Sequence, residues 1–86
     1  MDWQELEYEL ISLAERLDLE VRHVRYEGEG GLCVIGGRRV LVVNDLLDGP
    51  DRVAGLAEGL GSLPETEGLY VVPEVRRLLD RYRSKG

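Results

Sequence analysis

The chain has 86 residues, of which 43% are hydrophobic and 33% are charged, a composition typical of one globular domain and unlike that of a disordered chain. Its formal net charge of −6 argues against general nucleic-acid binding and against acidic membrane surfaces, because both partners attract basic proteins. No apolar run approaches the roughly 20 residues of a membrane span, and the acidic start MDWQELEYEL is unlike a signal peptide, so we expect a cytoplasmic protein.

The chain begins with the pattern of an amphipathic helix, which we expect from about Asp2 to Leu17. Apolar residues recur there at the three- and four-residue steps that place side chains on one helical face. They are Trp3, Leu6, Leu10, Leu13 and Leu17. This stripe predicts one side of a hydrophobic core.

Three strands are expected after this helix. The segment LEVRHVRY, residues 19–26, is rich in β-branched residues and ends on an aromatic one. The segment EGEGG, residues 27–31, predicts a turn. The runs LCVI and RVLVV flank Gly36 and Gly37, and two glycines between apolar runs are a typical β-hairpin signal. The continuous apolar run in the second arm of the hairpin predicts a strand that is at least partly covered on both faces.

Two more helices are expected in the second half of the chain, because proline suits the first position of a helix. Pro50 predicts a helix from about Pro50 to Leu60, and Pro73 predicts a last helix with an apolar face. Between them, LPETEG predicts a loop and LYVV, residues 69–72, predicts a short strand. We therefore expect one α+β domain spanning residues 1–86. Its order would be helix, three-stranded antiparallel meander, helix, short strand and helix, with the helices on one face of the sheet.

The helix RVAGLAEGLGSL, residues 52–63, is unusual because it keeps three glycines, and glycine weakens a helix interior. Glu58 and Ser62 lie one turn apart on the surface of this helix, and Gly55 and Gly59 flank them. Because glycine has no side chain, these four positions form a strip with few side-chain atoms, which we call the glycine strip. We expect close packing on this strip, by the last helix or by a second copy of the chain. The alternative is that the strip forms the floor of a groove that binds a peptide or another protein.

The order of these segments, from Asp2 to Leu63, resembles that of ImmA/IrrE-type zinc metallopeptidase domains. That family carries a helix of the form L-A-H-E-L-G-H, in which two histidines bind zinc and the glutamate is the general base. Here LAEGLGSL matches the leucine, alanine and glycine positions, but the histidine positions fall on Glu58 and Ser62 and the glutamate position on Gly59. The resemblance therefore implies a scaffold without its catalytic residues, and we expect no metal or other cofactor.

A second resemblance covers most of the chain. The segment GGLC, the hairpin, the Leu-Ala-Glu helix and the closing Pro-Glu-Val-Arg are similar to those of a family of small bacterial proteins of unknown activity. This resemblance implies a bacterial source and no particular chemistry. Asparagine, glutamine, methionine and cysteine, which are chemically labile at high temperature, are scarce in the chain, and this predicts a thermophilic source.

Other reactive side chains give weaker hypotheses. The single cysteine, Cys33, lies in an apolar run where we expect it to pack as a small hydrophobe; the alternative is a reactive pair with His23 across adjacent strands. Three aspartates surround the start of the helix at Pro50, and capping of that helix explains them better than calcium does. They are Asp45, Asp48 and Asp51.

The function that these observations favour is association with another protein, most simply as a homodimer, without enzymatic activity. Two copies could cover the glycine strip, the apolar edge of the hairpin, or the terminal helices, of which the first is acidic and the last basic. The basic residues are Arg76, Arg77, Arg81 and Arg83. The alternative is a metal-binding or hydrolytic protein that uses Glu58 and Ser62, helped by Glu65 or Glu67.

Overall fold

The acidic start of the chain forms helix α1, Trp3–Arg16, in a computed structural model that describes residues 1–83. A capping box begins the helix: the Asp2 carboxylate accepts a hydrogen bond from the Glu5 backbone N–H at 2.8 Å, and the Glu5 carboxylate accepts one from Asp2 at 3.3 Å. The helix ends where Asp18 takes a left-handed conformation with φ of 58° and the Leu19 N–H bonds back to the Ala14 carbonyl. The predicted helix is confirmed to within one residue at each end.

Three strands follow, β1 (Glu20–Val24), β2 (Gly31–Ile35) and β3 (Arg38–Asn44). Strands β2 and β3 form the predicted antiparallel hairpin, and both turn residues, Gly36 and Gly37, have the positive φ that glycine permits. Strand β1, however, pairs with β3 in parallel, so the strand order is β1-β3-β2. The fold class is α+β as expected, but the expected antiparallel meander is wrong because β3 lies at the centre of a mixed sheet.

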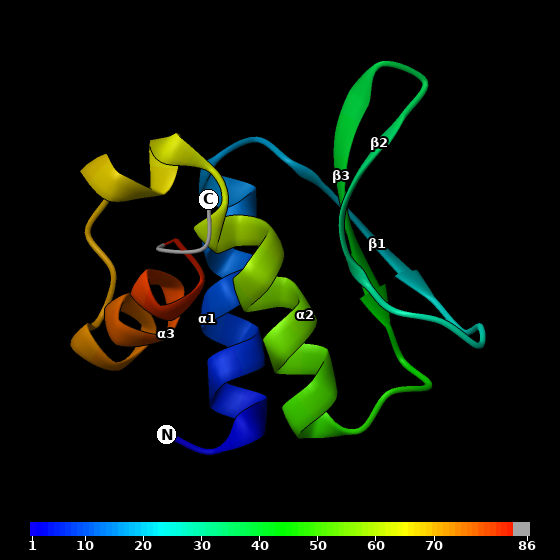
Figure 1. The fold of residues 1–86 in the computed structure, drawn as a ribbon, viewed down its shortest axis with the longest axis horizontal. Helices are drawn as coiled ribbons and strands as arrows, with labels where there is room; N and C mark the ends of the chain where they lie inside the picture. The colour runs from blue at the N-terminus through cyan, green and yellow to red at the C-terminus, as the bar shows by residue number, and fades with distance from the viewer. Residues whose placement is uncertain (84–86) are drawn as a thin grey trace.

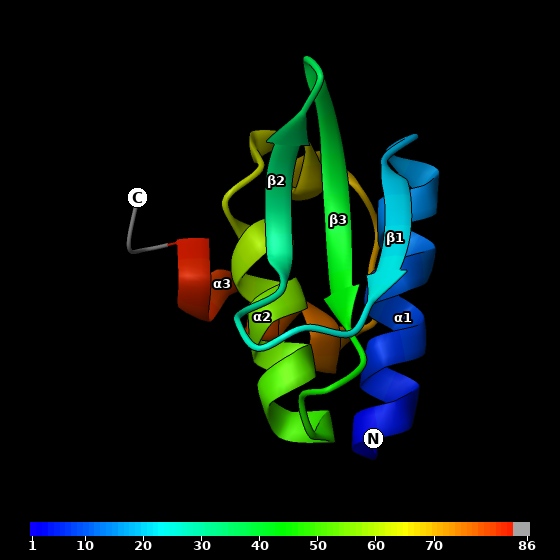
Figure 2. The same ribbon diagram turned by 90° about the vertical axis from the view of Figure 1, so that its right-hand side faces the viewer.

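The buried side chain of Asn44 explains how the chain reaches this strand order. Residues 25–30 carry the chain from β1 across the end of β3 to the start of β2 (Figure 2). The Asn44 amide nitrogen donates hydrogen bonds to the carbonyls of Tyr26 and Gly28, at 2.9 and 2.7 Å, and its amide oxygen accepts one from the Leu46 N–H at 3.1 Å. One side chain at the end of β3 thus ties the crossing loop to the strand that it passes.

The remaining elements are helix α2 (Gly49–Gly61), the 3-10 helix η1 (Pro64–Gly68) and helix α3 (Pro73–Arg83). They lie with α1 on one face of the sheet, while the hairpin of β2 and β3 extends beyond them (Figure 1). Asp48 caps α2 by accepting a hydrogen bond from Asp51 at 3.1 Å, and Pro50 stands in its first turn. Both predicted helices are confirmed, and the expected loop LPETEG contains the 3-10 helix.

The expected short strand at residues 69–72 is wrong, because no strand forms in this segment. Its backbone is bonded to side chains rather than to a neighbouring strand. The carbonyl of Tyr70 accepts a hydrogen bond from Arg16 at 2.7 Å, and the carbonyl of Leu69 accepts one from Arg76. Leu69, Val71 and Val72 still pack against the core, which explains their apolar character.

The core lies between the sheet and the helices α1 and α2, and continues between these two helices and α3 (Figure 1). Its buried side chains come from α1, α2, α3 and the inner face of β3, and they include Leu10, Leu13, Leu41, Val43, Leu56, Leu60 and Leu79. Every residue from Val40 to Val43 is buried, as expected for the continuous apolar run of a central strand. None of the described helices is long and apolar enough to cross a lipid bilayer.

Candidate functional site

The glycine strip of α2 packs against the start of β2 and the loop before it. A Cβ atom at Gly59 would lie 2.8 Å from the backbone nitrogen of Leu32, and one at Gly55 would lie 3.4 Å from the carbonyl oxygen of Gly30. The expected occupant, α3 or a second copy, is therefore wrong for Gly55 and Gly59. Helix α3 does pack against the third glycine, Gly61, since a Cβ added there would lie 2.8 Å from the carbonyl oxygen of Leu79.

Glu58 and Ser62 remain exposed beside this packed strip. They line a hollow of about 380 Å³ between α2, the start of η1 and the end of α3. The Ser62 hydroxyl donates a hydrogen bond to the Gly59 carbonyl at 2.7 Å, as serine does near a helix end. Within residues 1–83, no group of three histidine, cysteine or acidic side chains is arranged to hold a metal ion.

The two glutamates that could assist Glu58 each lie beside an arginine. Glu65 lies 2.7 Å from the Arg39 guanidinium, and this hydrogen bond lowers the pKa of Glu65 below its usual value. Glu67 lies 3.5 Å from the Nε atom of Arg83. These carboxylates therefore join η1 to the hairpin and to α3.

The arginines of α3 fall into two groups. Arg76 donates to the Leu69 carbonyl, and Arg83 donates to Asp80 at 2.8 Å and to the Thr66 hydroxyl at 3.3 Å, so both fasten α3 to the rest of the chain. Arg77 and Arg81 are exposed. Arg76 and Arg83 thus have partners within the chain, and the charged interface of the four arginines stays a prediction.

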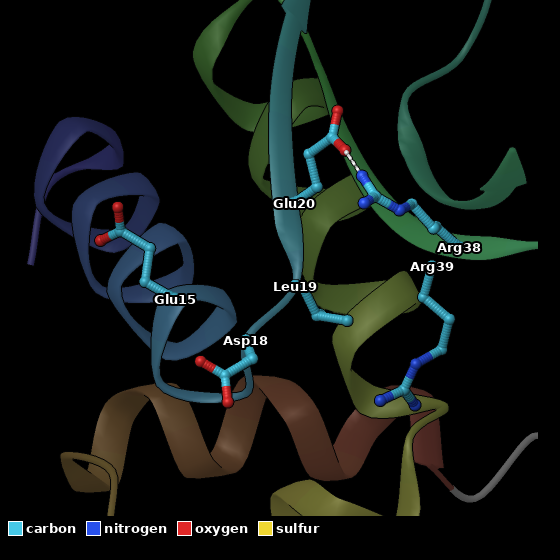
Figure 3. Close-up of a pocket in the computed structure, with 6 residues that line it drawn as sticks. All are labelled: Glu15, Asp18, Leu19, Glu20, Arg38 and Arg39. Atoms are coloured by element: carbon cyan, nitrogen blue, oxygen red, sulfur yellow. Dashed lines mark ion pairs between the residues drawn. The ribbon is translucent and has the colours of Figure 1, made fainter. Parts of the chain in front are cut away.

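A larger hollow, of about 630 Å³, lies between the end of α1 and the base of the hairpin. Figure 3 shows Glu15 and Asp18 on one side of it, Arg38 and Arg39 on the other, and Leu19 between them. Both arginines already face acids of the same chain: Arg38 lies 3.6 Å from Glu20, and Arg39 is the partner of Glu65. The lining contains no serine, cysteine or histidine, and its acidic groups are the carboxylates of Glu15, Asp18 and Glu20.

His23 and Cys33 do not form the pair that was considered. β3 separates their strands, and the register places Cys33 opposite Val40 and His23 opposite Val43, on opposite faces of the sheet. His23 instead lies 3.3 Å from the carboxylate of Asp45. The expectation that Cys33 packs inside is also wrong, because its side chain is exposed.

The position of strand β2 within the sheet could not be predicted from the sequence. It lies at one edge of the sheet, its five residues GLCVI carry no charge, and its last three side chains are exposed, with Val34 at 72% and Ile35 at 43%. The opposite edge, β1, reads EVRHV and carries charged side chains. An edge strand without charge, proline or bulge is open to pairing with another strand. The sequence indicated an apolar hairpin arm, but only the strand order shows that this arm is an edge.

Comparison of the sequence and the structure with protein-family models, curated proteins and solved structures gives no significant match. The two resemblances noted in the sequence stay predictions.

Proposed function

We propose that this chain is a non-enzymatic, cytoplasmic association domain that acts as a homodimer. The observation that supports the proposal is the uncharged, exposed edge of β2. Natural sheets protect such edges with charges, prolines or covering segments, because an open edge has backbone groups ready to pair. Within residues 1–83, β2 has none of these devices along its last three residues, so retention of this edge is best explained by a partner that covers it.

The test is the mass of the untagged protein by native mass spectrometry and light scattering, for the wild type and two lysine variants. Val34→Lys puts a charge on the β2 edge, whereas Tyr70→Lys puts the same charge on a side chain that is equally exposed, 75% against 72%, but lies in the segment before α3. We expect the wild type and Tyr70→Lys to be dimers and Val34→Lys to be a folded monomer. A wild-type protein that stays monomeric at several hundred micromolar would overturn the proposal.

The same spectra test the alternative of a metal-binding or hydrolytic protein. We expect each species to have the mass of the polypeptide alone. A stoichiometric metal ion that is lost in Glu58→Ala would replace the proposed function with metal binding at that helix. Loss of dimer mass in Glu58→Ala, without a metal, would instead place the interface on α2.

A further inference from the structure

The tip of the β2–β3 hairpin extends past the rest of the sheet (Figure 2). Strand β1 begins its pairing with β3 at Glu20, which lies opposite Val40, and the residues of β3 before Val40 pair with β2 alone. Residues 34–39 therefore form a two-stranded ribbon, which we call the hairpin arm. An isolated two-stranded hairpin is marginally stable at best, so the arm needs contacts outside itself to keep one position.

Apolar packing does little to hold the arm. Side chains alternate between the two faces of a strand, so Val34 and Arg39 lie on the same face as Leu41, toward the helices. Val34 is nevertheless 72% exposed, and a Cβ added at either glycine of the turn would meet nothing within 4 Å. The helices thus leave this face of the arm largely open.

Two ion pairs join the arm to the rest of the domain. On the face toward the helices, the Arg39 guanidinium lies 2.7 Å from the Glu65 carboxylate of η1, and these side chains are 41% and 42% exposed. On the outer face, Arg38 is 78% exposed and lies 3.6 Å from Glu20. The pair of Arg39 and Glu65 is the closer contact, and it connects the sheet to a different layer. Surface ion pairs contribute little stability and are weakened by salt, so this contact is easily released.

The base of the arm has room for movement. The hollow of about 630 Å³ lies there, with Arg38 and Arg39 on one side and Glu15 and Asp18 on the other (Figure 3). The arm is therefore not packed against the end of α1. It can change its angle to the helices without disturbing the core.

We propose that the ion pair of Arg39 and Glu65 is a latch that holds the hairpin arm against η1, and that the arm swings away from the helices when this pair is released. Release needs no unfolding, because the buried residues 40–43 and their pairing with β1 lie outside the arm. Val34 and Ile35 belong to the arm, so the latch also sets the direction of the exposed end of β2. The importance of that direction rests on the proposed function, whereas the latch itself acts within one chain.

Backbone order parameters measured by NMR test the latch. In the wild type at low salt, we expect values of about 0.85 for residues 34–37, as in rigid backbone, and in Arg39→Gln values below about 0.6, as in flexible segments. Residues 40–43 should stay at about 0.85 in both proteins, which shows that the sheet remains folded. Arg38→Gln is the matched control, because it removes the same charge from the neighbouring residue and should leave the arm ordered.

A double-mutant cycle separates the latch from any other role of its two side chains. Glu65→Gln should lower the order parameters of the arm as far as Arg39→Gln does. The double variant should be no lower than either single variant, because both changes break the same contact. Salt at about 1 M, where the Debye length is about 3 Å, should loosen the arm of the wild type and leave that of Arg39→Gln unchanged.

A wild-type arm that is already flexible, or an equally rigid arm in Arg39→Gln, would overturn the latch. Equal losses in Arg38→Gln, or additive losses in the cycle, would also overturn it, because the order of the arm would then not depend on this one contact.

Measurement at two protein concentrations tenfold apart separates the latch from the proposed homodimer. A loss of order in Arg39→Gln that is the same at both concentrations supports a latch within one chain, even if native mass spectra show a monomer and so overturn the homodimer. A loss that appears only at the higher concentration would assign the order of the arm to association, and would overturn the latch while leaving the homodimer intact.

Discussion

Gly59 is the residue at which α2 and β2 have the least room. A Cβ there would lie 2.8 Å from the Leu32 nitrogen and 3.0 Å from the Leu32 Cβ, and backbone atoms cannot move aside cheaply. We expect Gly59→Ala to lower the free energy of unfolding by about 1–3 kcal/mol, as overpacking does in cores. The control is Gly55→Ala in the same helix, where the nearest atom would be 3.4 Å away. Alanine favours a helix by up to about 1 kcal/mol over glycine, so Gly55→Ala should be neutral or stabilising in urea denaturation. Equal losses for both would contradict this packing.

Arg39 sets the ionisation of Glu65. Its hydrogen bond lowers the pKa of Glu65, so the folded protein holds the proton less tightly than the unfolded chain. The pair therefore contributes stability above the unfolded pKa, and this contribution is lost as the pH falls through the folded pKa. We expect Arg39→Gln to raise the pKa of Glu65 toward its usual value in an NMR titration of the side-chain carboxyl. Arg38→Gln is the control, because Arg38 faces Glu20 instead. A Glu65 pKa that is unchanged in Arg39→Gln would show that the pair does not form in solution.

At the scale of elements, Asn44 decides where the chain between β1 and β2 runs. Its amide donates to two carbonyls of the crossing loop and accepts from Leu46. Asn44→Asp keeps the shape but replaces the donor by an acceptor facing two carbonyl oxygens, and leaving buried groups unpaired costs about 1–3 kcal/mol. We therefore expect Asn44→Asp to lower the free energy of unfolding by about 1–3 kcal/mol at neutral pH and to speed the hydrogen exchange of the backbone amides in residues 25–30. Tyr26→Phe, which removes an exposed hydroxyl bond in the same loop, should change stability by less than about 0.5 kcal/mol.

Asn44 also shows why part of the fold could be predicted and part could not. Local signals placed the helices and the hairpin, because caps, helical periodicity and the Gly36-Gly37 turn act over a few residues. The loop that crosses the end of β3 is fastened by a side chain that bonds to carbonyls 16 and 18 residues earlier, and no local pattern encodes that contact. Residues 69–72 have strand-like composition, but arginines of α1 and α3 bond to their backbone instead. The apolar edge of the hairpin was among the surfaces expected to pair two copies, but the sequence could not show that β2 is an edge strand, since an edge is defined only by the completed sheet.

For the whole molecule, the net charge of −6 opposes association, because two copies repel each other at long range. Any dimer must therefore be held by local contacts, and the β2 edge offers exposed apolar side chains together with the backbone groups of an edge strand. Such a dimer makes the unfolding equilibrium depend on protein concentration, because only folded chains can pair through β2. The thermal stability of the domain then reports on dimer formation.

We expect the melting temperature of the wild type to rise with protein concentration above the dissociation constant of the dimer. A hundredfold increase adds about 2.7 kcal/mol per dimer, or roughly 1.4 kcal/mol per protomer. For a domain of this size that corresponds to about 5–10 °C in calorimetry. Tyr70→Lys should show the same slope, whereas Val34→Lys should melt at one temperature throughout, because a lysine on the edge keeps the chain monomeric. A wild-type melting temperature that is independent of concentration while native mass spectra show a dimer would mean that the dimer dissociates well before the chain unfolds. The β2 edge would then serve a reversible contact rather than a permanent one.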